Sequence, residues 1–153
     1  MEGKTPRETE VVMSELVLPN DTNVLGNLMG GKLMYWIDIA GALVASRHSN
    51  KVVATVYIDN ISFKHPVRMG EMLIIKAKMV YVGKTSMSVK VRVYAENMKS
   101  NSEILTNEAR IVLVALDDEG RPCAVPRLIP ETEEEKAEFE KERLKKEGKN
   151  NSK

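Results

Sequence analysis

Residues Pro19 to Ser46 read PNDTNVLGNLMGGKLMYWIDIAGALVAS. The stretch begins as a polar loop, passes through Gly30 and Gly31, and continues as a segment that is apolar on nearly every side. Its pattern predicts one helix from Gly31 to about Arg47, and a helix that is apolar on most sides is buried. A single carboxylate, Asp38, lies in the middle. Because burying an unpaired charge is costly, Asp38 must be either locally satisfied or retained for a purpose.

The composition is typical of one globular domain, with 153 residues, 42% hydrophobic and 29% charged. A net charge of +1 gives no basic field for nucleic acid. No apolar run reaches the roughly 20 residues of a membrane span, and the polar first ten residues lack the apolar core of a signal peptide. Cys123 is the single cysteine, which predicts a structural thiol in a reducing, cytoplasmic setting. The spacing of cysteines, histidines and acids predicts no metal site.

Strand-like segments lie on both sides of the predicted helix. Val11 to Leu18 precedes it, and Val52 to Phe63, Met72 to Val82, Met87 to Glu96 and Glu103 to Leu116 follow it. Apolar and polar residues alternate in two of these segments, with Tyr81 expected on the apolar side, which predicts one dry and one wet face. The short links predict an antiparallel meander. The sequence therefore predicts an α+β fold in which a curved antiparallel five-stranded sheet wraps one long central helix.

The chain is expected to divide into three parts. Residues 1–10 are predicted to be flexible, residues 11–130 to form the domain, and residues 131–153 to form a charged helical or disordered tail. A regulatory or oligomer-contacting role and a simple solvated helix both stay open for the tail. Because even a curled five-stranded sheet leaves part of a helix uncovered, a second copy of the chain is expected to cover the rest, which predicts a dimer.

The glycine pair and the acid together indicate a catalytic arrangement. A helix N-terminus offers unpaired N–H groups that can stabilise an oxyanion, and Gly30 and Gly31 let a ligand approach them closely. Gly31 and Asp38 lie about 10 Å apart along the helix axis. An attacking water must lie within about 3 Å of both its base and the carbonyl carbon, so two antiparallel copies of the helix are needed. A hydrogen-bonded structural acid beside ordinary turn glycines is the alternative interpretation.

The segment PNDTNVLGNLMGGKLMYWIDIAGALVASRH resembles the active-site loop and central helix of hotdog-fold acyl-CoA thioesterases, the acyl-CoA hydrolase family. The segments IDNISFKHPVRMGE, KMVYVGKTSMSVKVRVYAEN and RPCAVPRLIPETEEE resemble the same family, so that the resemblance runs from about Val11 to Glu135. It implies a hotdog fold whose sheets join edge to edge in a dimer. It also implies further assembly, commonly a hexamer built as a trimer of dimers.

The resemblance also implies hydrolysis of acyl-CoA to a free acid and coenzyme A, with no metal or other cofactor. The family's catalytic acid falls on Asp38, its loop amide from the partner subunit on Asn23, and the backbone that polarises the thioester carbonyl on Gly30 and Gly31. Asp38 would act as general base on water or as a nucleophile that forms a mixed anhydride, and Asn23 would orient the water. Many relatives carry a histidine or an aromatic residue where this chain has Met29.

Coenzyme A carries phosphates, so basic residues are expected at its entrance. The candidates lie in two turns between strands and are Lys64, Arg68, Lys84, Thr85 and Ser86. Lysines in such turns also occur simply as solvated residues.

Two other functions stay open. Hotdog hydratases and dehydratases pair a histidine with an acid, and the loop before this helix has no histidine. A non-catalytic acyl-CoA sensor usually carries a DNA-binding helical pair, for which residues 1–10 are too few, and it would need neither Asp38 nor Asn23. Thiol release from acyl-CoA favours hydrolysis, binding without release favours a sensor, and hydration of an enoyl thioester favours a hydratase.

Overall fold

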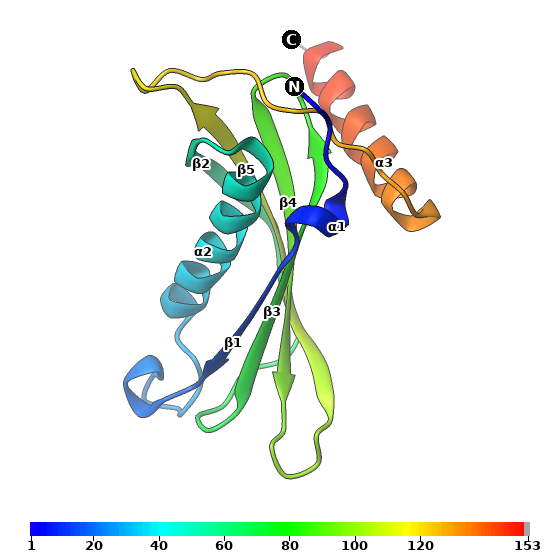
Figure 1. The fold of residues 1–153 in the computed structure, drawn as a ribbon. Coiled ribbons are helices and arrows are strands. Elements are labelled where there is room, and N and C mark those ends of the chain that lie inside the picture. Colours follow the sequence, from blue (N-terminus) through cyan, green and yellow to red (C-terminus); the bar gives the residue numbers. More distant parts are fainter. Residues whose placement is uncertain (152–153) are drawn as a thin grey trace.

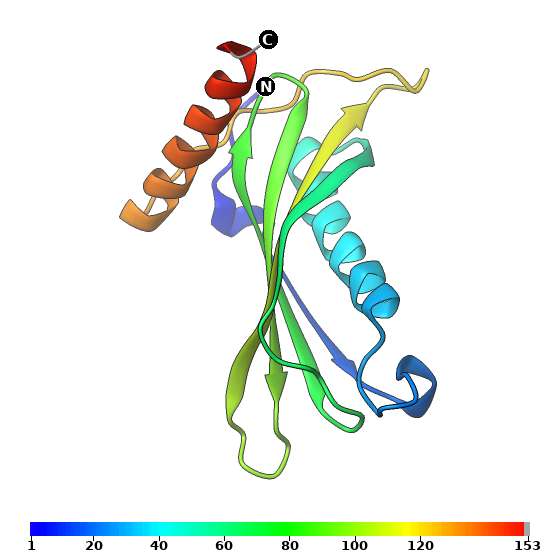
Figure 2. The same cartoon turned by 180° about the vertical axis from the view of Figure 1, so that it is seen from behind.

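The computed structural model describes residues 1–151 and shows one twisted sheet with a long helix on each side (Figure 1). Figure 2 shows the same two helices from behind, separated by the sheet. The elements in chain order are α1 (Pro6–Thr9), β1 (Val11–Leu16), the 3-10 helix η1 (Pro19–Asp21), α2 (Gly30–Ser49), β2 (Val52–Phe63), β3 (Met72–Val82), β4 (Ser86–Glu96), β5 (Glu103–Leu116) and α3 (Glu133–Asn151).

The strands form one antiparallel sheet in the order β1-β3-β4-β5-β2. The order makes β1 and β2 the two edges, and α2 contacts all five strands from one side. The α+β fold predicted from the sequence is therefore confirmed, with a five-stranded sheet wrapped around one helix. The predicted meander is correct only for β3, β4 and β5, because β2 pairs with β5 at the far edge and not with β3, the next strand along the chain. The bounds predicted for β2, β3 and β5 are those observed, and β4 begins one residue earlier, at Ser86.

The central helix α2 is slightly longer than predicted because of how its ends are formed. It begins at Gly30, after Met29, whose side chain makes no capping hydrogen bond. It ends at Ser49, and the next residue, Asn50, adopts the left-handed conformation (φ 56°) and donates its N–H to the carbonyl of Ser46, as is common where a helix stops. A Cβ at Gly41 would lie 2.6 Å from Cδ1 of Ile111, so this glycine lets α2 approach β5 closely.

The dry face of β3 and β4 lies under α2, as the alternation predicts. Its buried side chains are Leu73, Ile75, Ala77, Met79, Met87, Val89, Val91 and Val93. Tyr81 is the exception, because the register with β4 shifts between Met79 and Tyr81. An extra residue in one strand reverses the alternation beyond it. Tyr81 therefore packs against Phe139 of α3 on the other side of the sheet, with ring centroids 4.9 Å apart, and the prediction that it faces the core is wrong.

One side of α2 stays open, as predicted. Ile37 and Val44 are fully buried against the sheet, whereas Tyr35 is 58% and Leu43 is 43% exposed. Full burial of one such aliphatic side chain contributes about 1.5–3 kcal/mol, so the exposed apolar residues of this side represent stabilisation that the single chain does not gain.

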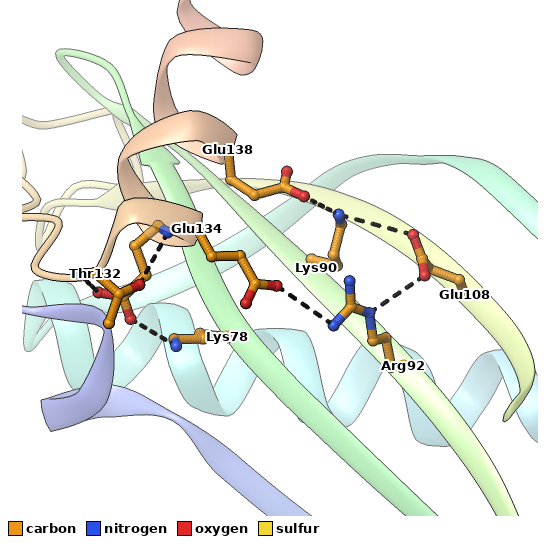
Figure 3. A network of polar contacts seen from close by, with 8 residues as sticks. Lys78, Lys90, Arg92, Glu108, Thr132, Glu134 and Glu138 are labelled. Carbon is orange, nitrogen blue, oxygen red and sulfur yellow. Dashed lines mark hydrogen bonds and ion pairs between the residues drawn. The ribbon is translucent and has the colours of Figure 1, made fainter. Parts of the chain in front are cut away.

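Helix α3 binds the outer side of the sheet mainly through charge. Three cations lie directly opposite one another in adjacent strands, an arrangement that is destabilising for like charges. Each cation pairs with one glutamate of α3: Lys78 with Glu135 at 2.6 Å, Lys90 with Glu138, and Arg110 with Glu142 at 2.5 Å. Figure 3 shows the first two of these contacts, beside Arg92, which lies between Glu108 and Glu134.

The tail is therefore a helix with one face bound to the sheet. Although burial by itself raises the pKa of Glu138, the hydrogen bond and the charge of Lys90 lower it below the usual value. Burial also raises the pKa of Glu135, but hydrogen bonds from Lys78 and from two backbone N–H groups lower it below the usual value. These carboxylates stay ionised at neutral pH and hold α3 in place.

The first ten residues, expected to be flexible, make specific contacts instead. The N–H of Lys4 donates to the carbonyl of Arg127 at 3.0 Å, and the N–H of Ile129 donates to the carbonyl of Lys4 at 2.8 Å. The ammonium group of Lys4 donates to the carbonyl of Arg47 near the end of α2 at 2.7 Å. Local composition could not reveal this segment's structure, because its partners lie far away along the chain.

His48 joins the end of α2 to the segment that follows β5. It is fully buried, and its Nε2 donates to the carbonyl of Pro126 at 2.6 Å. Its Nδ1 has no hydrogen-bond partner within the described residues. Burial is the main cause that lowers the pKa of His48 below the usual value, and Lys4 adds to it, against smaller raising effects of the Pro126 carbonyl and Glu8.

The free energy of unfolding should therefore fall as the pH is lowered from about 8 to about 5.5. The unfolded chain has an ordinary histidine pKa of about 6.5 and takes up the proton that folded His48 resists, while Glu135 and Glu138 stay ionised throughout this range. Urea unfolding at the two pH values measures the effect. His48→Gln, which keeps a donor for Pro126, should shrink the difference, and His65→Gln, at an exposed site, should not. Equal pH dependence in His48→Gln and the parent would contradict this.

Candidate active site

Asp38 lies on the open side of α2, facing the edge strand β2. It is half-buried, and its Oδ1 accepts a hydrogen bond of 2.7 Å from the hydroxyl of Thr55. Its Oδ2 has no hydrogen-bond partner among the described residues. The sequence left open whether Asp38 is locally satisfied or retained for a purpose. One carboxylate oxygen is satisfied by Thr55, and the other is left for a ligand.

Thr55 is the site residue that the sequence reasoning missed. A hydroxyl on a strand is common, and nothing local connects it with an acid seventeen residues earlier. The available signal is its place as the one polar residue in the apolar run from Val52 to Ile58. Only the packing of β2 beside α2 shows that the hydroxyl reaches Asp38.

The start of α2 presents free backbone donors. Leu33 makes the first hydrogen bond of the helix, to the carbonyl of Met29, which leaves the N–H groups of Gly30 and Gly31 at the helix end without intrahelical partners. Both glycines are exposed, and a Cβ at either would meet no atom within 4 Å. The space beside these two glycines is therefore open in the single chain.

Asn23 lies in the loop that leads into α2. Its Oδ1 accepts the N–H groups of Leu25 at 2.9 Å and Asn27 at 3.2 Å, which folds the loop as an Asx turn. The residue is exposed, and its Nδ2 has no hydrogen-bond partner among the described residues. The amide donor is therefore the part of Asn23 that is left for a ligand.

Asp21 anchors this loop to the helix start. Its buried carboxylate accepts the N–H of Leu18 at 3.0 Å and lies 3.7 Å from the ammonium group of Lys32. Its carbonyl accepts the N–H of Met29 at 2.9 Å. Asn23 and the glycine pair are held together by these contacts.

The predicted catalytic residues form two groups within one chain. Gly30 and Gly31 begin α2 and Asn23 lies in the loop before it, whereas Asp38 lies with Thr55 about halfway along the helix. The rise of a helix separates Gly31 from Asp38 by about 10 Å along its axis. A single chain does not bring the two groups together.

The predicted coenzyme A contacts also fall in two places. Lys64 and Arg68 are exposed in the loop after β2, which is hydrogen-bonded to residues 26–28 of the loop before α2. Of the other three candidates, Lys84 and Thr85 lie in the turn between β3 and β4, and Ser86 is the first residue of β4. Because β4 starts at the end of the sheet opposite to that where β2 stops, the two sets are separated by about 35 Å, the length of an eleven-residue strand.

The described residues offer no group of three or more His, Cys, Asp or Glu side chains placed to hold a metal ion. None of the helices within residues 1–151 has both the length and the apolar character needed to cross a bilayer. Cys123 is a free, half-buried thiol.

Comparison with known proteins gives the family. Residues 25–101, half of the chain, match the thioesterase superfamily. The chain belongs to this superfamily. An uncharacterized acyl-CoA thioester hydrolase of Bacillus subtilis, YkhA, is 36% identical to this thioesterase-superfamily protein over 129 residues, which cover 84% of this chain and 75% of that one.

Solved structures of thioesterases share the fold. An apo-hexameric acyl-CoA thioesterase superimposes with a TM-score of 0.93 at 36% identity, over 99% of this chain and 97% of that one. An acyl-CoA hydrolase from Staphylococcus aureus, in complex with butyryl coenzyme A, coenzyme A and coenzyme A disulfide, has a TM-score of 0.88 at 31% identity, over 97% of this chain and 90% of that one. The hotdog fold implied by the sequence resemblance is confirmed.

Three variants of the S. aureus hydrolase replace residues of the same types, at the same spacing, as Asn23, Asp38 and Thr55 of this chain. They replace with alanine an asparagine at its position 28, an aspartate at 43 and a threonine at 60. The separations of 15 and 17 residues are those between Asn23 and Asp38 and between Asp38 and Thr55. The third type, a threonine, corresponds to the residue that sequence reasoning missed in this thioesterase-superfamily chain.

Asp21→Ala should destabilise the protein by about 1–3 kcal/mol, because it leaves the N–H of Leu18 unpaired and Lys32 without its carboxylate. Asp21→Asn keeps an acceptor for Leu18 and should cost less. Urea unfolding of the two variants beside the parent measures the difference. Equal stability of Asp21→Ala and the parent would show that the loop does not depend on this anchor.

Proposed function

We propose that this protein hydrolyses acyl-CoA thioesters to a free carboxylic acid and coenzyme A. The observation that carries the proposal is the hydrogen bond between Thr55 and Asp38 on the open side of α2. Asn23 stands at the same distance along the chain from this pair as the asparagine of the S. aureus hydrolase. The names of the relatives, which are acyl-CoA thioester hydrolases, support the substrate class.

The active site is composed of two copies of the chain. A base and an oxyanion donor must lie within a few ångströms of one reacting carbonyl, and the helix start and Asp38 of one chain are about 10 Å apart. In an antiparallel pair of α2 helices, the glycine pair and Asn23 of one copy lie beside Asp38 of the other. Each dimer then holds two equivalent sites.

The edge strand β2 supplies the surface for this pairing. It is twelve residues long and exposes apolar side chains, with Val52 73% and Phe63 64% exposed. A long, exposed apolar edge invites strand pairing, and it adjoins the open side of α2 through Thr55. Two copies joined at β2 form a continuous sheet, and the hexameric relatives support further assembly of such dimers into a trimer of dimers.

The chemistry needs only an acid, a water and backbone donors, so we infer that it uses no metal and no other cofactor. As general base, Asp38 takes a proton from the water that attacks the thioester carbon, the C–S bond breaks, and the thiolate of coenzyme A leaves and takes up the proton. As nucleophile, the carboxylate of Asp38 attacks the thioester carbon and displaces the thiolate of coenzyme A, which gives a mixed anhydride that water then hydrolyses. In both routes the N–H groups of Gly30 and Gly31 stabilise the oxyanion, and Asn23 orients the water.

Lys64 and Arg68 lie at the helix-start end and are proposed to bind the phosphates of coenzyme A. Lys84, Thr85 and Ser86 can contact the same coenzyme A only if they come from another copy, because the far end of the sheet separates them from the first two. The free thiol of Cys123 supports a reducing compartment, and we propose the cytoplasm.

Asp38→Asn should lower the turnover of acyl-CoA at least about 100-fold, since general base or nucleophilic catalysis is lost, while the assembly stays intact. Release of free thiol from an acyl-CoA panel, from acetyl to palmitoyl, measures turnover, and Asp118→Asn on an exposed turn is the matched control. Undiminished thiol release in Asp38→Asn would remove Asp38 from the mechanism. In the parent protein, binding without thiol release would favour a sensor, and hydration of an enoyl thioester a hydratase.

A mixture of two inactive variants tests the shared site. When Asn23→Ala and Asp38→Asn chains are unfolded and refolded together, half of the dimers are mixed and each has one intact site, so about a quarter of the parent activity should return. Refolding each variant alone is the control. If both residues of a site came from one chain, the mixture would stay inactive.

A further inference from the structure

Strand β2 presents two side chains that are two residues apart to opposite sides of the sheet, which a regular strand does not do. Thr55 pairs with Leu113 and reaches Asp38 on the inner side, whereas Tyr57 pairs with Val112 and receives a hydrogen bond from Arg110 on the outer side. Residues two apart in a regular strand point to the same side. The register shift between Thr55 and Tyr57 therefore reverses the alternation and lets one strand serve both sides.

The segment after this bulge is short. Only Tyr57, Ile58 and Asp59 keep register with β5 before a second shift separates Asp59 from Ser62. A three-residue stretch between two irregularities specifies its register weakly. A slip of one residue would turn Asp59 toward the apolar core under α2, and it would move the neighbouring Thr55 hydroxyl relative to Asp38.

Arg110 of β5 holds this segment from the outer side. Its Nε and Nη2 donate to the two carboxylate oxygens of Asp59 at 3.0 and 2.9 Å, and Nη2 also lies 3.4 Å from the hydroxyl of Tyr57. Its Nη1 donates to Glu142 of α3 at 2.5 Å. The guanidinium is almost fully buried, and a two-pronged pair of this kind fixes geometry as well as charge.

We propose that Arg110 and Asp59 are a positioning pair for catalysis: from the outer side of the sheet they fix the register of β2 beyond its bulge, and so hold the Thr55 hydroxyl on Asp38. The inference rests on the proposed role of Asp38. Both residues lie on the side of the sheet opposite to the site. They would affect the reaction without touching the substrate or the reacting atoms.

Asp59→Ala tests the pair, with Glu142→Ala as the matched control. Both variants remove one carboxylate from the same guanidinium, but only the first frees β2. Asp59→Ala should lower kcat about tenfold, close to the effect of Thr55→Val, with KM unchanged within about twofold. Asp59→Asn, which keeps an acceptor for Arg110, should recover part of the loss. Glu142→Ala should lower the melting temperature and leave kcat within about twofold of the parent.

A double variant distinguishes a positioning role from a purely structural one, because the two roles predict different rates of thiol release. If Asp59 acts through Thr55, then Thr55→Val combined with Asp59→Ala should be no slower than Thr55→Val alone. Rates are measured as thiol release from the best substrate of the acyl-CoA panel, and size-exclusion chromatography checks that each variant keeps the parent's assembly.

Several outcomes would overturn the inference. These are parent-like kcat in Asp59→Ala, equal loss of kcat in Glu142→Ala, additive losses in the double variant, or loss of kcat that accompanies dissociation of the assembly. If Asp38→Asn keeps full turnover, the proposed function itself fails. If Asp38→Asn is inactive and Asp59→Ala is fully active, only the positioning role fails.

Discussion

The structure depends on one packing constraint: helix α2 is apolar on more sides than one five-stranded sheet can cover. Ile37 and Val44 fill the core between helix and sheet, while Tyr35 and Leu43 remain exposed on the other side. The uncovered side adjoins the unpaired edge β2, so a single surface contains both the unburied apolar area and the unpaired strand. In the proposed dimer, a second copy of the chain completes the hydrophobic core and the sheet together, so the proposal follows from how the core is built.

The same surface contains the groups that we propose for catalysis. Asp38 lies on the open side of α2 and is tied to the edge strand by Thr55, and the free N–H groups of Gly30 and Gly31 lie at the helix start. Because helix geometry keeps these groups about 10 Å apart in one chain, the proposed mechanism needs the same pairing that would bury the open side of α2. Catalytic sites at subunit interfaces follow naturally when the acid and the oxyanion donors belong to one long helix.

On the outer side of the sheet, helix α3 is bound mainly by charge rather than by apolar packing. A row of cations in adjacent strands, Lys78, Lys90 and Arg110, would repel one another if left alone. Glutamates at helical spacing on α3 neutralise the row, so a helix with few apolar residues still binds the sheet. Arg110 differs from the other two cations, since it also holds Asp59 of β2. Its hydrogen bond to Asp59 is the main cause that keeps the pKa of Arg110 above the usual value, so the charge is permanent.

The sequence by itself determined the central helix, the five strands and the central acid, because periodicity, turn residues and the lone carboxylate Asp38 are local properties. The position of β2 beside β5 was decided by the tertiary structure, because a short link does not specify which strand a segment pairs with. Resemblance to a known family supplied the hotdog fold and the role that we propose for Asn23. Only the tertiary structure decided which way Tyr81 and Tyr57 face, since a bulge changes the alternation without a clear mark in the sequence. It alone placed Thr55 on Asp38, pinned Lys4 to Arg127 and bound α3 to the sheet. These contacts join residues far apart in the chain, and no local pattern specifies a distance between them.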